Sequence, residues 1–435
     1  MKYVSLNDPH CVREWPEAVW EGLAPDKGLY FPAQLPAIPA AQLLDAGLRH
    51  PAEVGARLLA PLFAPQLSAP ALEALLRDAL DFPLPLVELE PGLWVLELFH
   101  GPTAAFKDVG ARVMARLLAA QMPPQDAPLT VLVATSGDTG SAVAQGFLGM
   151  PGVRVVILFP RGRISHLQEM QLTTAGENVH AFEVDGSFDA CQTLVKQAFL
   201  DASLRPRLPL TSANSINLAR WMPQAVYYAW ATQQLGQAVH FVVPSGNLGN
   251  LAAGVLAHRM GMPATGFTAA TNANDGYPQF LAGAPFEARP SVATLSNAMD
   301  VGDPSNRPRL DALFGDDVAA LRRGVQGFVL DDAGTSREMA AALRDWGYLA
   351  CPHTAVGLAA ARALRHPASP TSPAAPAAPI VALATAHPAK FAQTVTAATA
   401  AIPPLPPTLA ACLERTPVKS SLPADYAALR AALLA

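Results

Sequence analysis

One lysine, Lys107, stands in a setting that suggests chemistry. It lies in "FHGPTAAFKDVG" (99–110), after a glycine–proline pair and before an apolar stretch that predicts a helix. A lysine near anion-binding loops can be a phosphate ligand, or it can form a Schiff base with an aldehyde that carries a phosphate. A third interpretation is a helix lysine whose stem lies on apolar surface while its ammonium group stays in water. The other loops of the chain bear on this choice.

A loop rich in small and hydroxylated residues follows one predicted strand. The segment "ATSGDTGSA" (134–142) comes after "LTVLV" and contains Thr135, Ser136, Asp138 and Thr139. Small residues let a ligand approach the backbone, and N–H groups at the start of a helix favour an anion. An ordinary helix cap uses the same residue types, so that interpretation stays open.

A second glycine-rich loop, "PSGNLGN" (244–250), follows the apolar segment "VHFVV". Its central residues are Gly246, Asn247, Leu248, Gly249 and Asn250. The loop has neither the GxxxxGKS/T pattern of a P-loop nor the GxGxxG pattern of dinucleotide-binding proteins. A phosphate monoester held by backbone N–H groups without a cation fits it better than a nucleotide does.

Two further loops offer polar side chains. In "ANSINLARW" (213–221), Asn214 and Ser215 are predicted to cap the following helix, and Arg220 could reach back to an anion at its start. The alternative is a capped helix with a surface arginine. In "TAHPAKF", Thr385 ends a predicted core strand, and His387 is a candidate base. The alternative is a structural histidine at a helix start, which is favoured because no serine or cysteine nucleophile motif accompanies it.

These loops need strands and helices that position them. Short apolar segments predict strands at 93–98, 129–135, 153–159, 178–184, 239–244, 265–271 and 379–385. Helical patterns occur at 69–80, 190–200, 221–235, 335–347 and 422–435, and residues 1–90 are predicted to be mostly helical. Alternation of helices with fully apolar strands predicts an α/β fold with buried parallel sheets, in which ligands bind beyond the carboxyl ends of the strands.

Composition excludes several classes of protein. The chain has 435 residues, 51% of them hydrophobic, and a net charge of −5. We therefore expect two or three packed units and no nucleic-acid or anionic-membrane surface.

The four cysteines are far apart, which predicts neither a metal site nor a disulfide framework. No run of 18 apolar residues and no signal peptide is found, and we expect a cytoplasmic protein. HExxH and GxSxG are also absent, which removes support for zinc proteases and α/β-hydrolases.

Taken together, the motifs resemble those of the threonine synthases, which are pyridoxal-phosphate enzymes of fold type II. The resemblance runs over essentially the whole chain and is carried by the loops above and by "LAPDKGLYFP" (23–32), "LFPRGRISHLQEMQ" (158–171), "ATNANDGYP" (270–278) and "TLSNAMDVGDPSN" (294–306). It implies two parallel-sheet α/β domains with the cofactor between them and a mostly helical N-terminal region. The expected parts are residues 1–90, a catalytic core at 91–400 with a Pro/Ala-rich surface insertion at 366–379, and a C-terminal tail and helix at 401–435.

The resemblance also implies roles for the candidate residues. Lys107 would hold pyridoxal 5'-phosphate as an imine, the amides of Gly246, Asn247, Leu248, Gly249 and Asn250 would bind its phosphate, and Thr385 would bind its pyridine nitrogen. The implied substrate-binding residues are Thr135 and Ser136 for the carboxylate, and Thr139, Asn214, Ser215 and Arg220 for the phosphate, with Asp138 nearby in a role left open. Leu248 departs from the phenylalanine usual in the family; because backbone donors bind the phosphate, we expect binding to survive.

The implied activity is conversion of O-phospho-L-homoserine and water to L-threonine and phosphate, the last step of threonine biosynthesis, by a monomer or homodimer. A related reaction, namely serine or threonine dehydration or β-replacement, stays open, as does a phospho-lyase that stops at ketobutyrate. A binding protein that keeps the fold without catalysis is the alternative from another class.

Overall fold

The computed structural model describes residues 1–121, 127–204, 207–366 and 378–435. The chain divides into two compact units, each built from segments that are distant in sequence. Unit 1 comprises Met1, Pro32–Gly101 and Trp221–Pro404, and unit 2 comprises Lys2–Phe31, Pro102–Arg220 and Leu405–Ala435. Residues 367–377 of the predicted Pro/Ala-rich insertion lie outside the described residues.

Unit 2 contains a five-stranded parallel sheet in the order β14-β8-β7-β6-β9. Its strands are β6 (Leu129–Ala134), β7 (Val153–Pro160), β8 (Val179–Asp185), β9 (Leu210–Ser212) and β14 (Ser420–Pro423). Its helices are α1 (Trp15–Glu21), α5 (Lys107–Gln121), α6 (Asp138–Gly146), α7 (His166–Thr173), α8 (Phe188–Leu200), α9 (Leu218–Trp221), α18 (Pro407–Leu413) and α19 (Tyr426–Leu434). All residues of β6 are buried, as the continuous apolar pattern of a central parallel strand predicts.

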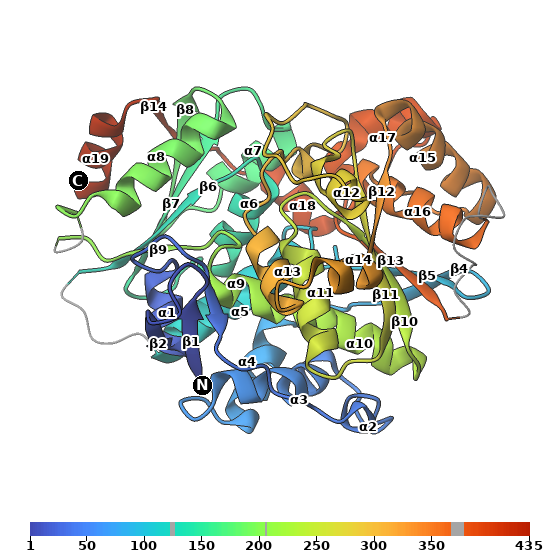
Figure 1. Ribbon diagram of the computed structural model, residues 1–435. Coiled ribbons are helices and arrows are strands. Elements are labelled where there is room, and N and C mark those ends of the chain that lie inside the picture. Colours follow the sequence, from blue (N-terminus) through green and yellow to red (C-terminus); the bar gives the residue numbers. More distant parts are fainter. Residues whose placement is uncertain (122–126, 205–206, 367–377) are drawn as a thin grey trace. The chain divides into compact units, whose positions relative to one another are not determined.

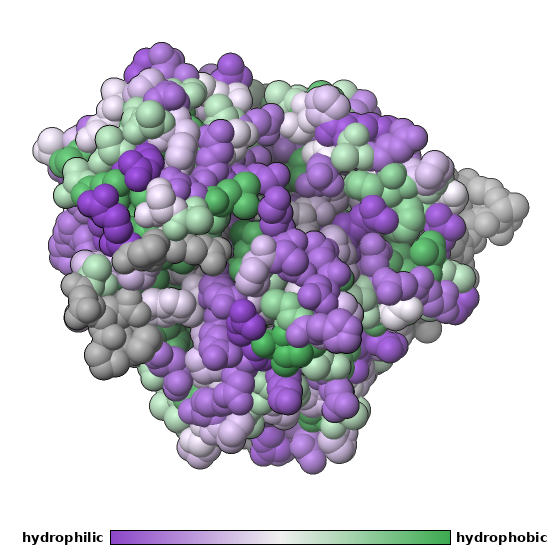
Figure 2. Space-filling view, turned by 60° about the vertical axis from the view of Figure 1, so that its left-hand side comes forward, coloured by the Kyte–Doolittle hydropathy of each residue, from purple (hydrophilic) through white to green (hydrophobic). Residues whose placement is uncertain are grey.

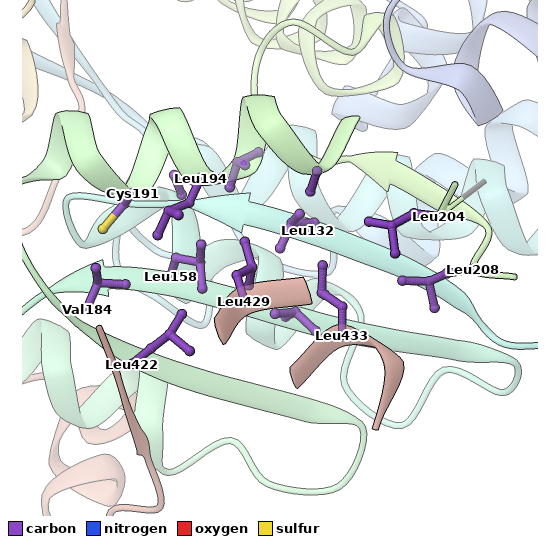
Figure 3. Packing of buried hydrophobic residues seen from close by; sticks show 14 residues of the cluster. Leu132, Leu158, Val184, Cys191, Leu194, Leu204, Leu208, Leu422, Leu429 and Leu433 are labelled. Carbon is purple, nitrogen blue, oxygen red and sulfur yellow. The ribbon is translucent and has the colours of Figure 1, made fainter. Parts of the chain in front are cut away.

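An apolar cluster joins this sheet to helices from two parts of the sequence. Leu132 and Leu158 of the sheet pack with Leu194 of α8, and Leu429 and Leu433 of α19 pack against the same cluster (Figure 3). The C-terminal segment is therefore part of the core of unit 2.

The prediction that residues 1–90 are mostly helical is wrong for the first third of that segment. A small sheet in the order β2-β1-β3 is formed by β1 (Lys2–Ser5), β2 (Val12–Glu14) and β3 (Tyr30–Pro32). These strands have only three or four residues, and β2 exposes two of its three residues, so they lack the apolar run that marks a strand in the sequence.

Unit 1 contains a six-stranded sheet in the order β12-β11-β10-β13-β5-β4. Its strands are β4 (Leu86–Glu90), β5 (Leu93–Glu97), β10 (Val239–Pro244), β11 (Ala264–Thr271), β12 (Val325–Val329) and β13 (Ile380–Ala384). All neighbours are parallel except β4, which pairs antiparallel with β5 at one edge. The predicted α/β fold with parallel sheets is confirmed for both units.

Helices surround the sheet of unit 1 in Figure 1, and α16 packs against β10, β11, β12 and β13. The helices of this unit are α2 (Ala40–Leu43), α3 (Pro51–Phe63), α4 (Ala69–Ala79), α10 (Ala225–Leu235), α11 (Gly249–Arg259), α12 (Gly276–Leu281), α13 (Arg307–Leu313), α14 (Val318–Gly324), α15 (Asp332–Trp346), α16 (Pro352–Arg365) and α17 (Ala392–Thr399). Short 3-10 turns are η1 (Met222–Gln224), η2 (Asn297–Met299) and η3 (Pro388–Phe391). The helix predicted at 221–235 begins with η1 because Pro223 cannot donate a backbone hydrogen bond.

The surface mixes polar and apolar residues. On the face in Figure 2, hydrophilic residues surround small apolar areas, as expected of a chain with 15% charged residues. No helix in the described part of the chain has the length and apolar character that crossing a membrane requires.

Candidate active site

Lys107 is the first residue of α5 in unit 2, and a buried carboxylate fixes the turn before it. The fully buried Asp108 accepts hydrogen bonds from the backbone N–H of Thr103 at 2.9 Å and from its hydroxyl at 2.6 Å. The carbonyl of Thr103 in turn accepts from Nε2 of Gln171 at 3.1 Å. Lys107 itself is half-buried, with Nζ 5.8 Å from the centre of the Phe106 ring. The lysine therefore extends from a rigid helix start.

Arg220 lies beside this helix start and is not a surface residue. Its side chain is buried, its Nη1 donates to the carbonyl of Lys107 at 2.8 Å, and its Nε donates to the carbonyl of Ala213 at 2.8 Å. A Cβ on Gly110 would lie 2.5 Å from the carbonyl oxygen of Arg220, so α5 can pack this closely only with glycine there. Arg220 thus connects the lysine segment to the loop after β9.

Asn217, which the prediction did not include, contributes to the start of α9. Its side-chain oxygen accepts from the N–H of Ala219 at 2.9 Å. Asn217 also donates to the carbonyl of Val19 at 2.8 Å, so a fully buried residue does the capping. Asn214 instead donates from Nδ2 to the carbonyl of Ala134 at 3.2 Å and thereby joins the ends of β9 and β6.

The "TSGDTG" loop after β6 is held together by its own first residue. The Thr135 hydroxyl oxygen accepts from the N–H groups of Gly137 at 2.9 Å and Gly140 at 2.8 Å. Gly137 has φ +130, and a Cβ there would lie 2.4 Å from Cδ of Gln168. Asp138 is buried and accepts from Nε2 of Gln168 at 3.0 Å.

This arrangement separates the hydroxyl groups of the loop into two kinds. The Thr135 hydroxyl is buried and already accepts two hydrogen bonds, so a ligand could receive only its proton. Ser136 and Thr139 are half-buried, at and beside the start of α6. N–H groups and hydroxyls at a helix start are a suitable environment for a carboxylate or a phosphate.

In unit 1, the "PSGNLGN" loop leads from β10 into α11. Leu248 lies in the left-handed region, with φ 59 and ψ 0, and its carbonyl accepts from the N–H of Ala252 at 2.9 Å. The N–H groups of Leu248, Gly249, Asn250 and Leu251 therefore precede the first intrahelical hydrogen bond. Such a group of N–H donors at a helix start binds an anion without a cationic side chain.

Side chains from distant segments hold this loop in place. A Cβ on Gly246 would lie 2.7 Å from Cα of Met299, so η2 packs directly on the loop backbone. The Asn247 side-chain oxygen accepts from the N–H of Ser305 at 2.7 Å, and its carbonyl accepts from Nδ2 of Asn306 at 3.2 Å. These supporting residues belong to "TLSNAMDVGDPSN" (294–306), a motif whose role sequence reasoning did not identify, because nothing in it has the pattern of a ligand-binding loop.

Asn250 is also held by aromatic residues. Its Oδ1 accepts from the hydroxyls of Tyr227 at 2.6 Å and Tyr228 at 2.7 Å, both on α10. Among the described residues, its buried Nδ2 has no hydrogen-bond partner.

Thr385 and His387 follow β13. Thr385 is 6% exposed and is the first residue after β13, whereas the prediction made it the last residue of the strand. His387 accepts from the N–H of Ala389 at 3.1 Å at the start of η3 and packs edge-on against Phe99. Burial and then the neighbouring His100 lower the pKa of His387 to about 4, so it is neutral at pH 7. Its ring nitrogen caps η3, which favours the structural interpretation of this histidine over a base.

Within the ranges that the structure describes, no group of three or more His, Cys, Asp and Glu side chains is placed to hold a metal ion. The candidate residues are an amine, hydroxyls, amides and helix-start N–H groups, and these suit organic anions.

Comparison with known proteins identifies relatives over the whole chain. Family models described as "Threonine synthase N terminus", "Pyridoxal-phosphate dependent enzyme" and "Threonine synthase, C-terminal" match residues 2–80, 80–386 and 354–433. The threonine synthase of Serratia marcescens is 43% identical over 369 residues, which cover 84% of each chain. The crystal structure of threonine synthase from Escherichia coli superposes with a TM-score of 0.91 at 41% identity, covering 100% of this chain and 99% of the other. A threonine synthase from Brucella melitensis, described as PLP-bound, superposes with a TM-score of 0.91 at 36% identity over 100% of this chain and 99% of its own.

Proposed function

Because the chain belongs to the threonine synthases, which are pyridoxal-phosphate-dependent lyases, we propose that it converts O-phospho-L-homoserine and water to L-threonine and phosphate. The observation that carries this proposal is the connection of three candidate loops within unit 2. Arg220 hydrogen-bonds to the carbonyl of Lys107, and Asn214 hydrogen-bonds to the carbonyl of Ala134 before the "TSGDTG" loop. An amine and two anion-binding loops are what a phosphorylated amino acid requires.

The residues of unit 1 fit the cofactor. Pyridoxal phosphate has a phosphate monoester, for which the N–H groups of Gly246, Asn247, Leu248, Gly249 and Asn250 are suitable donors. The buried Asn250 Nδ2, which lacks a partner among the described residues, is an additional donor beside this loop. Thr385 offers its hydroxyl to the pyridine nitrogen. When bound, the cofactor supplies an electron sink that stabilises negative charge at the substrate Cα.

We propose that the substrate is bound through its two anionic ends. Thr135 and Ser136 bind the carboxylate, for which Thr135 contributes its hydroxyl proton and Ser136 its more exposed hydroxyl. Thr139, Asn214, Ser215 and Arg220 bind the phosphate. Arg220 donates from Nε and Nη1 to the carbonyl groups of Ala213 and Lys107, and these hydrogen bonds keep its guanidinium at this loop. Asp138 orients the loop through Gln168.

Lys107 has two roles in this proposal. Its Nζ would hold the cofactor, and as a free amine it would remove the proton from the substrate Cα and return protons later in the reaction. General acid–base catalysis by one positioned group contributes about 10²–10⁴-fold to a rate. The fixed turn around Asp108 and Thr103 keeps the lysine in position for both tasks.

The test combines visible absorption with product analysis. The wild-type protein is expected to show the absorption band of bound cofactor and to release phosphate and threonine in equal amounts from O-phosphohomoserine. Lys107→Ala is expected to lose the band and to reduce the rate by at least about 10²–10⁴-fold. Lys196→Ala, which changes an exposed lysine of the same unit, is the matched control and is expected to behave as wild type.

The products distinguish the alternatives. Phosphate with ketobutyrate would make the protein a phospho-lyase, and equal rates with serine and O-phosphohomoserine would indicate a dehydratase. Absence of both the band and phosphate release, with cofactor added, would contradict the proposal and leave a binding protein.

We also propose the location, oligomeric state, partners and domain division that the sequence predicts. The protein acts in the cytoplasm, as a monomer or homodimer, without nucleic-acid or membrane partners. It comprises an N-terminal region at 1–90, a catalytic core at 91–400 and a C-terminal tail at 401–435, a division supported by the family matches at 2–80, 80–386 and 354–433.

A further inference from the structure

Unit 1 contains a fully buried arginine, Arg309, that has no place in the function proposed above. Arg309 is 0% exposed and lies in the first turn of α13. Its guanidinium carbon lies 4.4 Å from the centre of the Trp221 ring, which is itself buried. Burial lowers the pKa of Arg309 to about 9, so the side chain is still charged at pH 7. A buried charge is costly unless the surroundings compensate for it.

The guanidinium is connected to the "PSGNLGN" loop by two hydrogen bonds in series. Nη1 of Arg309 donates to Oδ1 of Asn306 at 2.7 Å, and Nδ2 of Asn306 donates to the carbonyl of Asn247 at 3.2 Å. Arginine has only donors, so Asn306 must turn its oxygen to Arg309 and its NH₂ group to the loop. The charge therefore dictates the orientation of the amide that holds Asn247.

Asn247 is held from a second direction by the residue next to Asn306. The N–H and hydroxyl of Ser305 donate to its Oδ1 at 2.7 and 3.0 Å. Both contacts come from the segment that leads into α13, and α13 packs against α11, the helix that the loop begins. Arg309 thus fixes the segment that supports the loop.

We propose that Arg309 is a positioning residue for the phosphate-binding loop. It orients Asn306, which holds the Asn247 backbone, and it places a positive charge two hydrogen bonds away from the loop whose N–H groups receive the phosphate. In surroundings of low dielectric, such a charge attracts an anion more strongly than it would in water. This inference rests on the proposed function, in which the loop binds the phosphate of pyridoxal phosphate.

The test compares pyridoxal phosphate with pyridoxal, which lacks the phosphate, by equilibrium dialysis against the full-length chain freed of cofactor. Arg309→Met removes the charge at similar volume and is expected to weaken binding of pyridoxal phosphate at least tenfold, while binding of pyridoxal changes less than twofold. The phosphorus NMR signal of the bound cofactor is expected to shift in this variant. Arg323→Met, at an exposed arginine of α14 in the same unit, is the control and is expected to change neither quantity.

The variant Asn306→Leu tests the two hydrogen bonds of Asn306 separately from the charge of Arg309. It also decides between the outcomes if the Arg309→Met protein does not fold. It keeps the cation but breaks both hydrogen bonds, and we expect a three- to tenfold loss for pyridoxal phosphate with little change for pyridoxal. A folded Arg309→Met or Asn306→Leu protein that keeps the wild-type ratio of the two dissociation constants would overturn the inference and leave the proposed function intact. A wild-type protein that binds both compounds equally would overturn the assignment of the loop itself.

Discussion

Two glycine-rich loops follow parallel strands in this protein, one in each unit, and they are held in different ways. The "TSGDTG" loop of unit 2 is organised from within, because the hydroxyl of Thr135 accepts hydrogen bonds from Gly137 and Gly140. The "PSGNLGN" loop of unit 1 is organised from outside, by Met299, Ser305 and Asn306, about 50 residues further along the chain. Similar composition therefore does not mean similar dependence on the rest of the fold.

The largest loss of stability is expected in the "TSGDTG" loop, because this loop depends on the single hydroxyl oxygen of Thr135. Thr135→Val leaves the N–H groups of Gly137 and Gly140 without their acceptor, and each buried donor left unpaired costs about 1–3 kcal/mol. We expect the free energy of unfolding to fall by about 2–6 kcal/mol in urea titrations, with a parallel loss of activity.

The control for this change lies on the strand that leads into the loop. Thr130 is buried, and its hydroxyl has no hydrogen-bond partner among the described residues. Thr130→Val is therefore expected to be neutral or stabilising. If Thr135→Val is as harmless as Thr130→Val, the loop is not held from within.

A pH titration tests the strand beneath the loop of unit 1. His240 of β10 is buried beside Thr268, and burial lowers its pKa from 6.5 to about 4. The unfolded chain therefore takes up a proton below pH 6.5 while the folded chain does not, so stability falls as the pH falls from 6.5 towards 4. Each pH unit in this window costs about 1.4 kcal/mol, or about 2 kcal/mol between pH 6.5 and 5.

His240→Gln is expected to remove this part of the pH dependence, as measured by urea unfolding at several pH values. The comparison is His180→Gln in β8 of unit 2, where the histidine is exposed and its pKa is lowered by burial and then by Arg154. If the free energy of unfolding changes with pH by the same amount in both variants, the acid sensitivity does not come from His240 in unit 1.

A smaller effect is expected from crowding the loop of unit 1. In Gly246→Ala the new Cβ would lie 2.7 Å from Cα of Met299, and a backbone atom cannot move aside as a side chain can. We expect the loop to shift and the dissociation constant of pyridoxal phosphate to rise about tenfold, which corresponds to about 1.4 kcal/mol.

Gly276→Ala is the matched substitution in the same unit, because its new Cβ would meet nothing closer than 3.8 Å. It is expected to leave cofactor affinity unchanged. Wild-type affinity in Gly246→Ala would mean that the packing of η2 on the loop does not position it.

The smallest effect is expected for the C-terminal segment of unit 2. Lys419 forms ion pairs with Glu183 at 2.7 Å and with Glu169, and the hydrogen bond from Lys419 is the main cause of the lowered pKa of Glu183. Lys419 is one-third exposed, so Lys419→Met is expected to cost no more than about 1 kcal/mol, and less at high salt. Because the pKa of Glu183 is depressed, this stabilisation is present at neutral pH and is lost as the pH falls below the ordinary pKa of glutamate. A loss larger than that of Thr135→Val would contradict the ranking.

The sequence predicts the parts of this protein whose physical cause is local. The strands β6, β7 and β10 are apolar segments with one polar residue each, and their bounds agree with the prediction within one residue. The two glycine-rich loops were found because glycine and hydroxyl residues directly after a buried strand have few other uses.

The sequence could not predict features that depend on partners far along the chain. Asn217 caps α9 because it also reaches the carbonyl of Val19, a residue almost 200 positions away, and nothing local distinguishes it from Asn214. The sequence left open whether Arg220 is a surface residue or reaches an anion at the helix start, because its burial depends on its hydrogen bond to the carbonyl of Lys107. Nothing local in the sequence distinguishes Arg309, because its burial follows from the packing of α13 and Trp221.

The interleaving of the two units in sequence has a consequence for synthesis on the ribosome. All of unit 1 has been made once Pro404 is added, whereas unit 2 still lacks Leu405–Ala435. Until then, β14 and α19 cannot add Leu422, Leu429 and Leu433 to the cluster around Leu132 and Leu158, so part of this apolar cluster stays uncovered. Such a surface invites aggregation. Leu405–Ala435 thus complete a core whose other members, from Leu132 to Leu208, are made earlier. A nascent chain that stalls before Leu405 should therefore depend on chaperones.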